Sequence, residues 1–207
     1  MVVLKPSGLL SVPGRLAEHH DSIISRIRTI HPQAMAVHRL DMDTSGIMVV
    51  GLAAKAISAL GKSFQRKEVS KEYLALVSGL IDKRGRVDLP IRCDLEHRPL
   101  QIVDFEQGKE SHTLYERVDS YRAAPLFKHE NTSLVRLTPQ TGRSHQLRVH
   151  MASIGHPILG DRFYADENSK SLAPRLCLHA AGLSFVHPFS MEKLSFYRLP
   201  EFVEKID

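Results

Sequence analysis

The ten residues VHRLDMDTSG, at positions 37–46, lead directly into an apolar run at positions 47–52. A short apolar run of this kind is typical of a strand that is buried on both faces. The polar segment before it then becomes a loop held by the core, and functional side chains are common on such loops. Two carboxylates, Asp41 and Asp43, lie in this loop. The segment therefore predicts an anionic centre tied to a buried strand.

The composition narrows the classes of protein and partner. The 207 residues are 43% hydrophobic and 25% charged, which fits a globular domain with a core. No apolar run approaches the ~20 residues of a membrane span, and the start lacks the pattern of a signal peptide. Lys and Arg exceed Asp and Glu by 28 − 23 = +5, which favours a polyanion such as RNA or DNA over a membrane surface.

Cys93 and Cys177 have no metal or redox spacing, so we expect reduced thiols in a cytoplasmic protein.

The hydrophobic periodicity predicts an α+β fold with a mainly antiparallel sheet, flanked by helices and loops. Helices are expected at 21–30, 53–66 and within 141–157. Asp21 is the expected N-cap of the first helix, and Thr141 or Ser144 that of the last. A short strand that leads into a loop is expected within 2–10, where Pro6 and Gly8 interrupt the apolar segment. Strands are expected at 47–52, 73–77, 101–105, 112–118, 133–137, 175–179, 182–187 and 194–197, with a polar excursion at 121–131. No linker divides the chain, so residues 1–207 are predicted to form one domain.

Arg148 lies among small and apolar residues on the last expected helix. A buried guanidinium needs a carboxylate, and the spacing alone favours a structural salt bridge to any acid of the chain. The functional alternative pairs Arg148 with Asp41 and keeps that carboxylate ionised. Tyr73 is either a core aromatic or a base-stacking residue that can move a proton. Arg39 is either a surface arginine or one directed at RNA.

The pattern does not distinguish Asp41 from Asp43, because either can cap a loop or carry chemistry. A nuclease or phosphatase that binds Mg²⁺ through both would usually recruit further acids, and none lies nearby in the sequence. His145 and His150 are five residues apart and do not share a helix face, so they do not suggest a zinc site. We therefore expect no metal.

The motifs in their order resemble the RluA-type pseudouridine synthases. HRLDMDTSG (38–46) is similar to the HRLD–two residues–TSG signature of that family. KPSGLLSVPG (5–14) and KEYLALV (71–77) are similar to its N-terminal loop and its tyrosine strand. TGRSHQLRVHM (141–151), GHPILGD (155–161) and RLCLHA (175–180) match its later segments. LLSVPGR, VDLPIRCD and GDRFYA, with no S4 domain, resemble its dual-specificity members, which act on 23S rRNA and tRNA.

The resemblance implies a pseudouridine synthase catalytic fold with an RNA-binding cleft across the middle. It implies that Asp41 is the catalytic aspartate, that Tyr73 contacts the target base and that Arg148 pairs with Asp41. Arg39 would enter the RNA helix as the uridine leaves it. Further RNA contacts are expected from His38, Thr44, Arg143 and His145. The enzyme would act as a monomer on a tRNA anticodon stem-loop and a 23S rRNA hairpin, without a cofactor.

Two departures from the family pattern and two other functions stay open. The family usually has another strand before KPSG, so an N-terminal strand is expected to be missing here. The segment 122–130 is longer than in the dual-specificity members, which leaves the RNA targets open. A non-catalytic RNA-binding module with the same fold is one alternative function, although binding alone does not need a paired, buried acid. The metal-dependent nuclease or phosphatase is the other, and EDTA would abolish its activity.

Overall fold

The apolar run after the aspartate loop forms β3 (Ser45–Gly51), and all of its residues are buried. The structure is a computed structural model that describes residues 1–14 and 16–206. The chain divides into two compact units. Unit 1 comprises Met1–Lys71 and Ala180–Arg198, and unit 2 comprises Glu72–His179 and the C-terminal residues from Leu199. The prediction of one domain over the whole chain stays a prediction.

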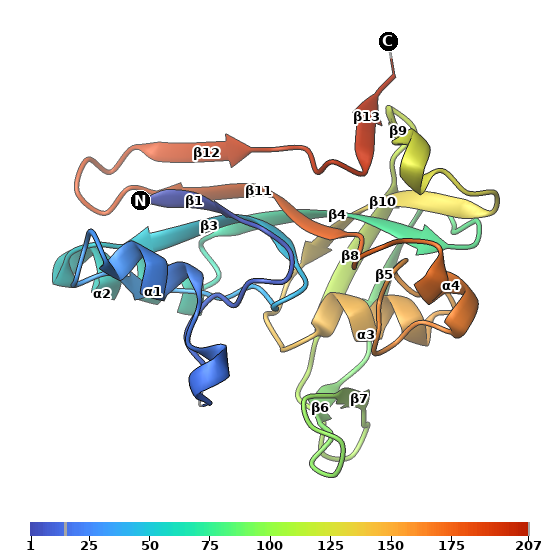
Figure 1. The fold of residues 1–207 in the computed structure, drawn as a ribbon, viewed down its shortest axis with the longest axis horizontal. Helices are drawn as coiled ribbons and strands as arrows, with labels where there is room; N and C mark the ends of the chain where they lie inside the picture. Colours follow the sequence, from blue (N-terminus) through green and yellow to red (C-terminus); the bar gives the residue numbers. More distant parts are fainter. Residues whose placement is uncertain (15, 207) are drawn as a thin grey trace. The chain divides into compact units, whose positions relative to one another are not determined.

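Unit 1 contains antiparallel strand pairs and two α-helices (Figure 1). Its elements are β1 (Val2–Lys5), the 3₁₀ turn η1 (Ala17–His19), α1 (Ile23–Arg28), β2 (Met35–Ala36), β3, α2 (Ala54–Gln65), most of β11 (Leu178–Val186) and β12 (Lys193–Tyr197). β3 pairs with β1 and with β2, and β11 pairs with β12. The register sets Val2 opposite Val49 on β3.

The two faces of β3 contribute to two apolar clusters, as expected for a strand buried on both sides. Ile47 and Val49 pack with Leu60 of α2 and with side chains of β11. Val50 packs in a second cluster with Ile24 of α1. Side chains on both faces therefore anchor β3, and this anchoring restricts the movement of the loop that precedes it.

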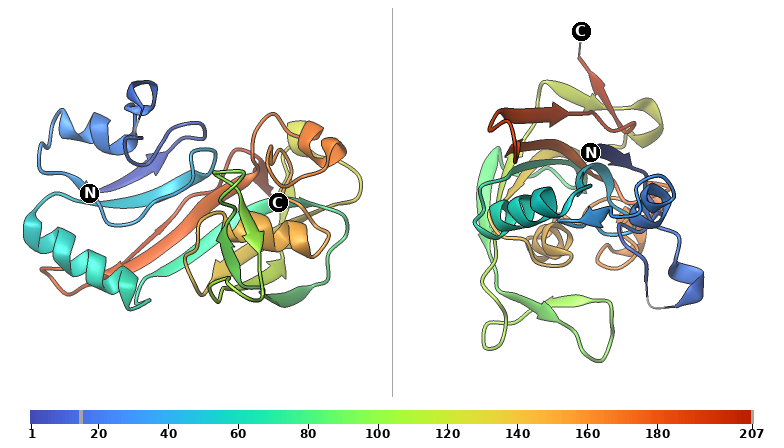
Figure 2. Two further views of the ribbon diagram at one scale, coloured as in Figure 1. Left: turned by 90° about the horizontal axis from the view of Figure 1, so that it is seen from below. Right: turned by 90° about the vertical axis from the view of Figure 1, so that its left-hand side faces the viewer.

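Unit 2 contains antiparallel strands in the order β4–β10–β8–β5. Its elements are most of β4 (Ser70–Ser78), β5 (Arg84–Asp88), β6 (Ile91–Cys93), β7 (Gln101–Val103), β8 (His112–Arg117), β9 (Tyr121–Ala123), the 3₁₀ turn η2 (Pro125–Phe127), β10 (Thr132–Pro139), α3 (Gln146–Ser153), α4 (Glu167–Ser171) and β13 (Val203–Lys205). Figure 2 gives two further views, in which α3 lies beside the strands of this unit. The β6–β7 hairpin extends away from the unit's sheet (Figure 1).

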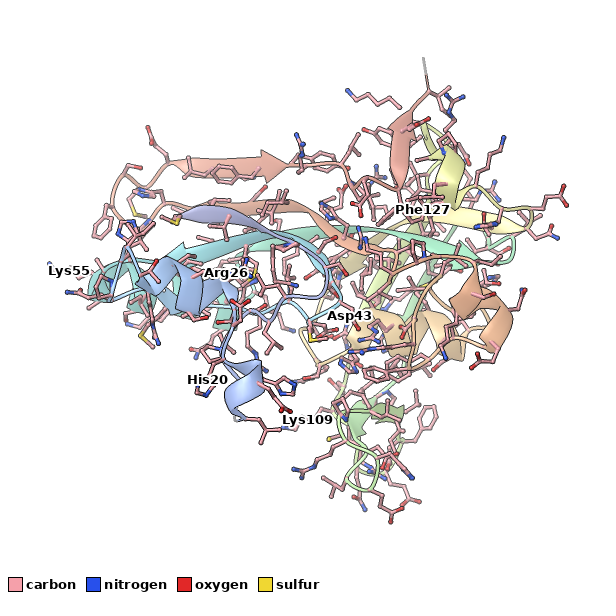
Figure 3. All side chains as sticks on the ribbon, viewed as in Figure 1. His20, Arg26, Asp43, Lys55, Lys109 and Phe127 are labelled. Carbon is pink, nitrogen blue, oxygen red and sulfur yellow. The ribbon has the colours of Figure 1, made fainter. Side chains whose placement is uncertain are left out.

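The segment at 121–131 is more ordered than the polar excursion expected from its sequence. β9 pairs with β13, and the turn η2 buries Phe127 against Phe202 at a centroid distance of 6.0 Å. Figure 3 labels Phe127 in this region. Phe127 is a weak sequence signal, because its partner Phe202 lies 75 residues further along the chain.

Both helix caps predicted from the sequence are wrong. Ser22, not Asp21, caps α1 through a reciprocal capping box with Ser25, and Asp21 instead forms an exposed salt bridge with Arg26. His145 is the N-cap of α3, in the left-handed region at φ 52°, without a side-chain cap bond. The strands expected at 175–179 and 182–187 form one strand, β11, because the intervening alanines stay in the sheet.

Candidate active site

The loop that carries Asp41 is held in place by the N-terminal segment of unit 1. The ammonium group of Lys5 is fully buried and donates to the carbonyls of Pro6, Leu9 and Met42 at 2.6–2.8 Å. Three donors of one ammonium thus satisfy three backbone acceptors at once. Met42 lies between the two aspartates, so this lysine fixes the backbone on which both carboxylates stand.

Serine hydroxyls complete the attachment of the loop. Ser7 Oγ donates to the carbonyl of Asp43 at 2.7 Å. Ser11 Oγ donates to the carbonyl of Leu40 at 2.7 Å and accepts from its N–H at 3.0 Å. The N–H of Thr44 donates to the carbonyl of Asp41 and closes a turn. The loop is rigid while the Asp41 side chain stays half-buried, which is the arrangement that a pre-organised reactive group needs.

Sequence reasoning did not single out Lys5 or Ser11 for this role. A usable signal for Lys5 is a lysine at the end of an apolar strand, immediately before a proline. Ser11 gives no such signal, because its partner Leu40 lies 29 residues away in the chain.

His38 belongs to the scaffold of the loop. Its Nε2 accepts a hydrogen bond from the N–H of Val49 at 3.0 Å, and its ring stacks on Phe64 at 4.5 Å. Burial, and secondly the positive charge of Lys71, lower the pKa of His38 to about 4. The imidazole is therefore neutral at physiological pH. Its expected contact with RNA stays a prediction.

The other residues predicted in this loop differ in exposure. Arg39 is exposed, whereas Thr44 is 2% exposed and its hydroxyl has no hydrogen-bond partner among the described residues. Asp43 lies in the loop before β3 (Figure 3). RNA contacts of Arg39 and Thr44 stay predictions.

In unit 2 the guanidinium of Arg148 is buried on α3 and paired with Asp161. Nε donates to Oδ2 at 2.7 Å and Nη2 donates to Oδ1 at 2.6 Å. Both side chains are at most 2% exposed. The need of a buried Arg148 for a carboxylate is confirmed, and Asp161 meets it. The expected pairing of Arg148 with Asp41 stays a prediction.

Aromatic side chains surround the same guanidinium. Its central carbon lies 5.1 Å from the ring centre of Phe163 and 5.2 Å from that of Tyr164. Tyr164 Oη is 2.6 Å from Nδ1 of His145 and accepts from the N–H of Gln101 at 2.9 Å. His145 therefore lies next to Arg148 in a network that the sequence did not predict.

The turn that leads into α3 is closed by Gln146. Its Oε1 accepts from the Thr141 hydroxyl at 2.8 Å and from the N–H of Arg143 at 3.0 Å. Thr141 thus binds a side chain of the helix instead of capping its backbone. The Arg143 side chain is exposed, and its Nε donates to the carbonyl of Glu110. Tyr73 is half-buried on β4, opposite Leu137 of β10.

Among the described residues, no three His, Cys, Asp or Glu side chains form a group able to hold a metal ion. None of the described helices is both long enough and apolar enough to cross a membrane. Cys93 and Cys177 are free cysteines, as expected.

Comparison with known proteins gives the family. The family model described as RNA pseudouridylate synthase matches residues 1–153. The chain is 52% identical over 197 residues to the dual-specificity RNA pseudouridine synthase RluA of Escherichia coli K12, covering 95% of this chain and 87% of the relative. It is 48% identical over 203 residues to the protein of the same name from Pasteurella multocida, covering 98% and 90%.

Solved structures agree with the sequence relatives. Human RNA pseudouridylate synthase domain containing 1 superposes with a TM-score of 0.77 at 28% identity, over 97% of this chain and 80% of the human chain. Human RNA pseudouridylate synthase domain containing 4 gives 0.72 at 27%, over 97% and 85%. The predicted α+β pseudouridine synthase fold is confirmed, and the chain belongs to the RNA pseudouridylate synthase family.

Proposed function

We propose that this member of the family isomerises uridine to pseudouridine in two kinds of RNA, a tRNA anticodon stem-loop and a 23S rRNA hairpin. The dual specificity is supported by the two dual-specificity RNA pseudouridine synthases above, which align with almost the whole chain at about 50% identity. The two RNA targets rest on the motif resemblance. A cytoplasmic, monomeric enzyme fits this role.

The observation that carries the proposal is the placement of Asp41. Its backbone is held by Lys5 and Ser11 through their bonds to the neighbouring residues, and its side chain is half-buried. The isomerisation breaks the N1–C1′ bond of uridine and forms a C5–C1′ bond. The ring loses the C5 proton and gains one at N1, so no electron donor or acceptor is needed. A carboxylate beside C1′ can stabilise or trap the electron-poor sugar.

The other two residues have supporting roles in this proposal. Tyr73 stands at the target base and helps to move the C5 proton. Arg148 keeps the Asp41 carboxylate ionised and oriented. Their joint action with Asp41 rests on the matching family motifs.

The charge of the chain supports RNA binding. A net charge of +5 favours contact with phosphates, and Arg39 and Arg143 are exposed for it. The uridine must leave its stack to reach a carboxylate; this costs a few kcal/mol, and the cost is lower in a loop than in a paired stem. We expect Arg39 to occupy the space that the base leaves.

Tritium release from [5-³H]uridine tests the proposal, because attaching the ring through C5 displaces the C5 hydrogen into water. An anticodon stem-loop and a 23S rRNA hairpin would be incubated with the protein in EDTA. Release from both RNAs is the expected result. Release from one alone would contradict the dual specificity, and RNA binding without release would favour the non-catalytic alternative. Strand cleavage that EDTA abolishes would favour the metal-dependent alternative.

A further inference from the structure

Two charged side chains in unit 2 are buried together with no role yet assigned to one of them. Arg148 is 1% exposed and Asp161 is fully buried. Burying two charges has a large desolvation cost, which good geometry and further hydrogen bonds must offset. We propose that Asp161 is a positioning residue of the reaction, which holds the Arg148 guanidinium in one orientation toward the catalytic carboxylate. This inference rests on the proposed function.

The carboxylate of Asp161 is itself fixed by its own turn. Its Oδ1 accepts from the N–H groups of Phe163 and Tyr164 at 3.0 and 3.3 Å, in addition to Arg148 Nη2. Gly160, just before it, has φ +72°, and a Cβ there would overlap the carbonyl of Arg175. Glycine is therefore the residue that suits this turn. The turn fixes the position of the Asp161 carboxylate, and the carboxylate fixes the orientation of the Arg148 guanidinium.

The two hydrogen bonds show which edge of the Arg148 guanidinium binds Asp161. The carboxylate binds the edge formed by Nε and Nη2. A planar guanidinium has a second edge, formed by Nη1 and Nη2, which can bind another carboxylate in the same plane. Asp161 does not use that edge. The proposed partner of that edge is the catalytic carboxylate of Asp41.

Two aromatic contacts also restrict rotation of Arg148. The rings of Phe163 and Tyr164 lie against the guanidinium, and the Tyr164 hydroxyl is tied to His145 and to the N–H of Gln101. His145 adopts φ 52°, in the left-handed region that histidine enters more often than most residues other than glycine.

The test compares Asp161→Asn, Asp161→Glu and the control Asp166→Asn. Asp166 accepts from the N–H and hydroxyl of Ser169 at 3.0 and 2.7 Å, so its change removes a helix cap without reaching Arg148. We expect kcat to fall about tenfold or more in both Asp161 variants. The RNA dissociation constant should stay unchanged. Asp166→Asn should match the wild type in both quantities.

If Asp161→Asn does not fold, Asp161→Glu decides the question, since it keeps the charge. A folded Asp161→Glu with the wild-type kcat would overturn the inference, and a lower kcat with unchanged RNA affinity would support it. A readout without activity separates this inference from the proposed function. The NMR signal of the Arg148 Nε–H, identified by its loss in Arg148→Lys, should exchange slowly with solvent in the wild type and quickly in the folded Asp161 variant. Equal exchange rates of this Nε–H in the wild type and in the Asp161 variant would contradict the positioning role of Asp161, even if no RNA were modified.

Discussion

At the scale of single residues, His38 shows how the aspartate loop depends on protonation. The ring accepts a bond from Val49 and stacks on Phe64, and both contacts suit a neutral imidazole. Burial lowers the pKa of His38 from 6.5 to about 4. Between pH 6.5 and pH 4, His38 is therefore protonated in the unfolded chain and neutral in the folded chain. Folding becomes less favourable as the pH falls through this range.

We predict that the free energy of unfolding decreases from pH 6.5 to pH 4 by at most about 3 kcal/mol through His38. Above pH 6.5 this contribution is complete, because the imidazole is neutral in both states. In His38→Gln, whose amide oxygen can still accept from Val49, the decrease should be smaller by that amount. Urea unfolding at several pH values measures both proteins. Identical pH dependence in the two would contradict the role given to His38.

Single residues also mark the limit of what the sequence predicts about the site. The motif indicated Asp41, Tyr73 and Arg148, and the burial of Arg148 follows from its apolar neighbours. Asp161 was missed as its partner, because the two are joined by a turn whose path the spacing does not reveal. The cap of α1 was misplaced by one position, since aspartate and serine cap helices equally well.

At the scale of elements, Gly46 joins the aspartate loop to the sheet of unit 1. Its φ is +128°, and a Cβ would overlap the backbone of Ala180 on β11. The glycine of the TSG triplet is thus required by a close approach of two strands. Because β3 follows at once, a change here should disturb both the sheet and the loop.

Gly46→Ala should lower the free energy of unfolding by about 2–4 kcal/mol, from overpacking and an unfavourable φ together. Gly61→Ala is the matched control. Gly61 lies inside α2 with open space around its Cα, so alanine there should raise stability by up to about 1 kcal/mol. Denaturant unfolding of both variants would check this. A Gly46→Ala protein as stable as the wild type would refute the close-approach argument.

Elements with a strong apolar period were predicted well. β3 and α2 begin and end within two residues of the expected 47–52 and 53–66. Their burial is dictated by side chains local to each segment. Boundaries were poorer where distant contacts decide, as in β11, which continues through the residues expected to separate two strands, and in η2, whose Phe127 packs on Phe202.

At the scale of the whole molecule, the two cysteine thiols differ in burial, so we expect them to react in different states of the chain. Cys177 is fully buried, and burial raises the pKa of its thiol to about 12. Cys93 is half-buried on β6. Since the thiolate is the reactive form, we predict that a disulfide reagent labels Cys93 in the folded protein and Cys177 only after unfolding.

The measurement is thiol titration of the native and urea-unfolded protein, with Cys93→Ser as the control. The wild type should give one fast and one unfolding-limited thiol, and the control should give only the slow one. A fast second thiol in Cys93→Ser would show that Cys177 is accessible in the native state.

The account as a whole rests on Asp41 as the residue that reacts at C1′. Its neighbour Asp43 has the same charge and lies in the same loop, and its contact with Ser7 uses the backbone carbonyl, which alanine retains. Tritium release in EDTA should therefore be compared for the wild type, Asp41→Ala and Asp43→Ala. The account predicts release by the wild type and by Asp43→Ala, and none by Asp41→Ala that is folded and still binds RNA. Release by Asp41→Ala at the wild-type rate would contradict it.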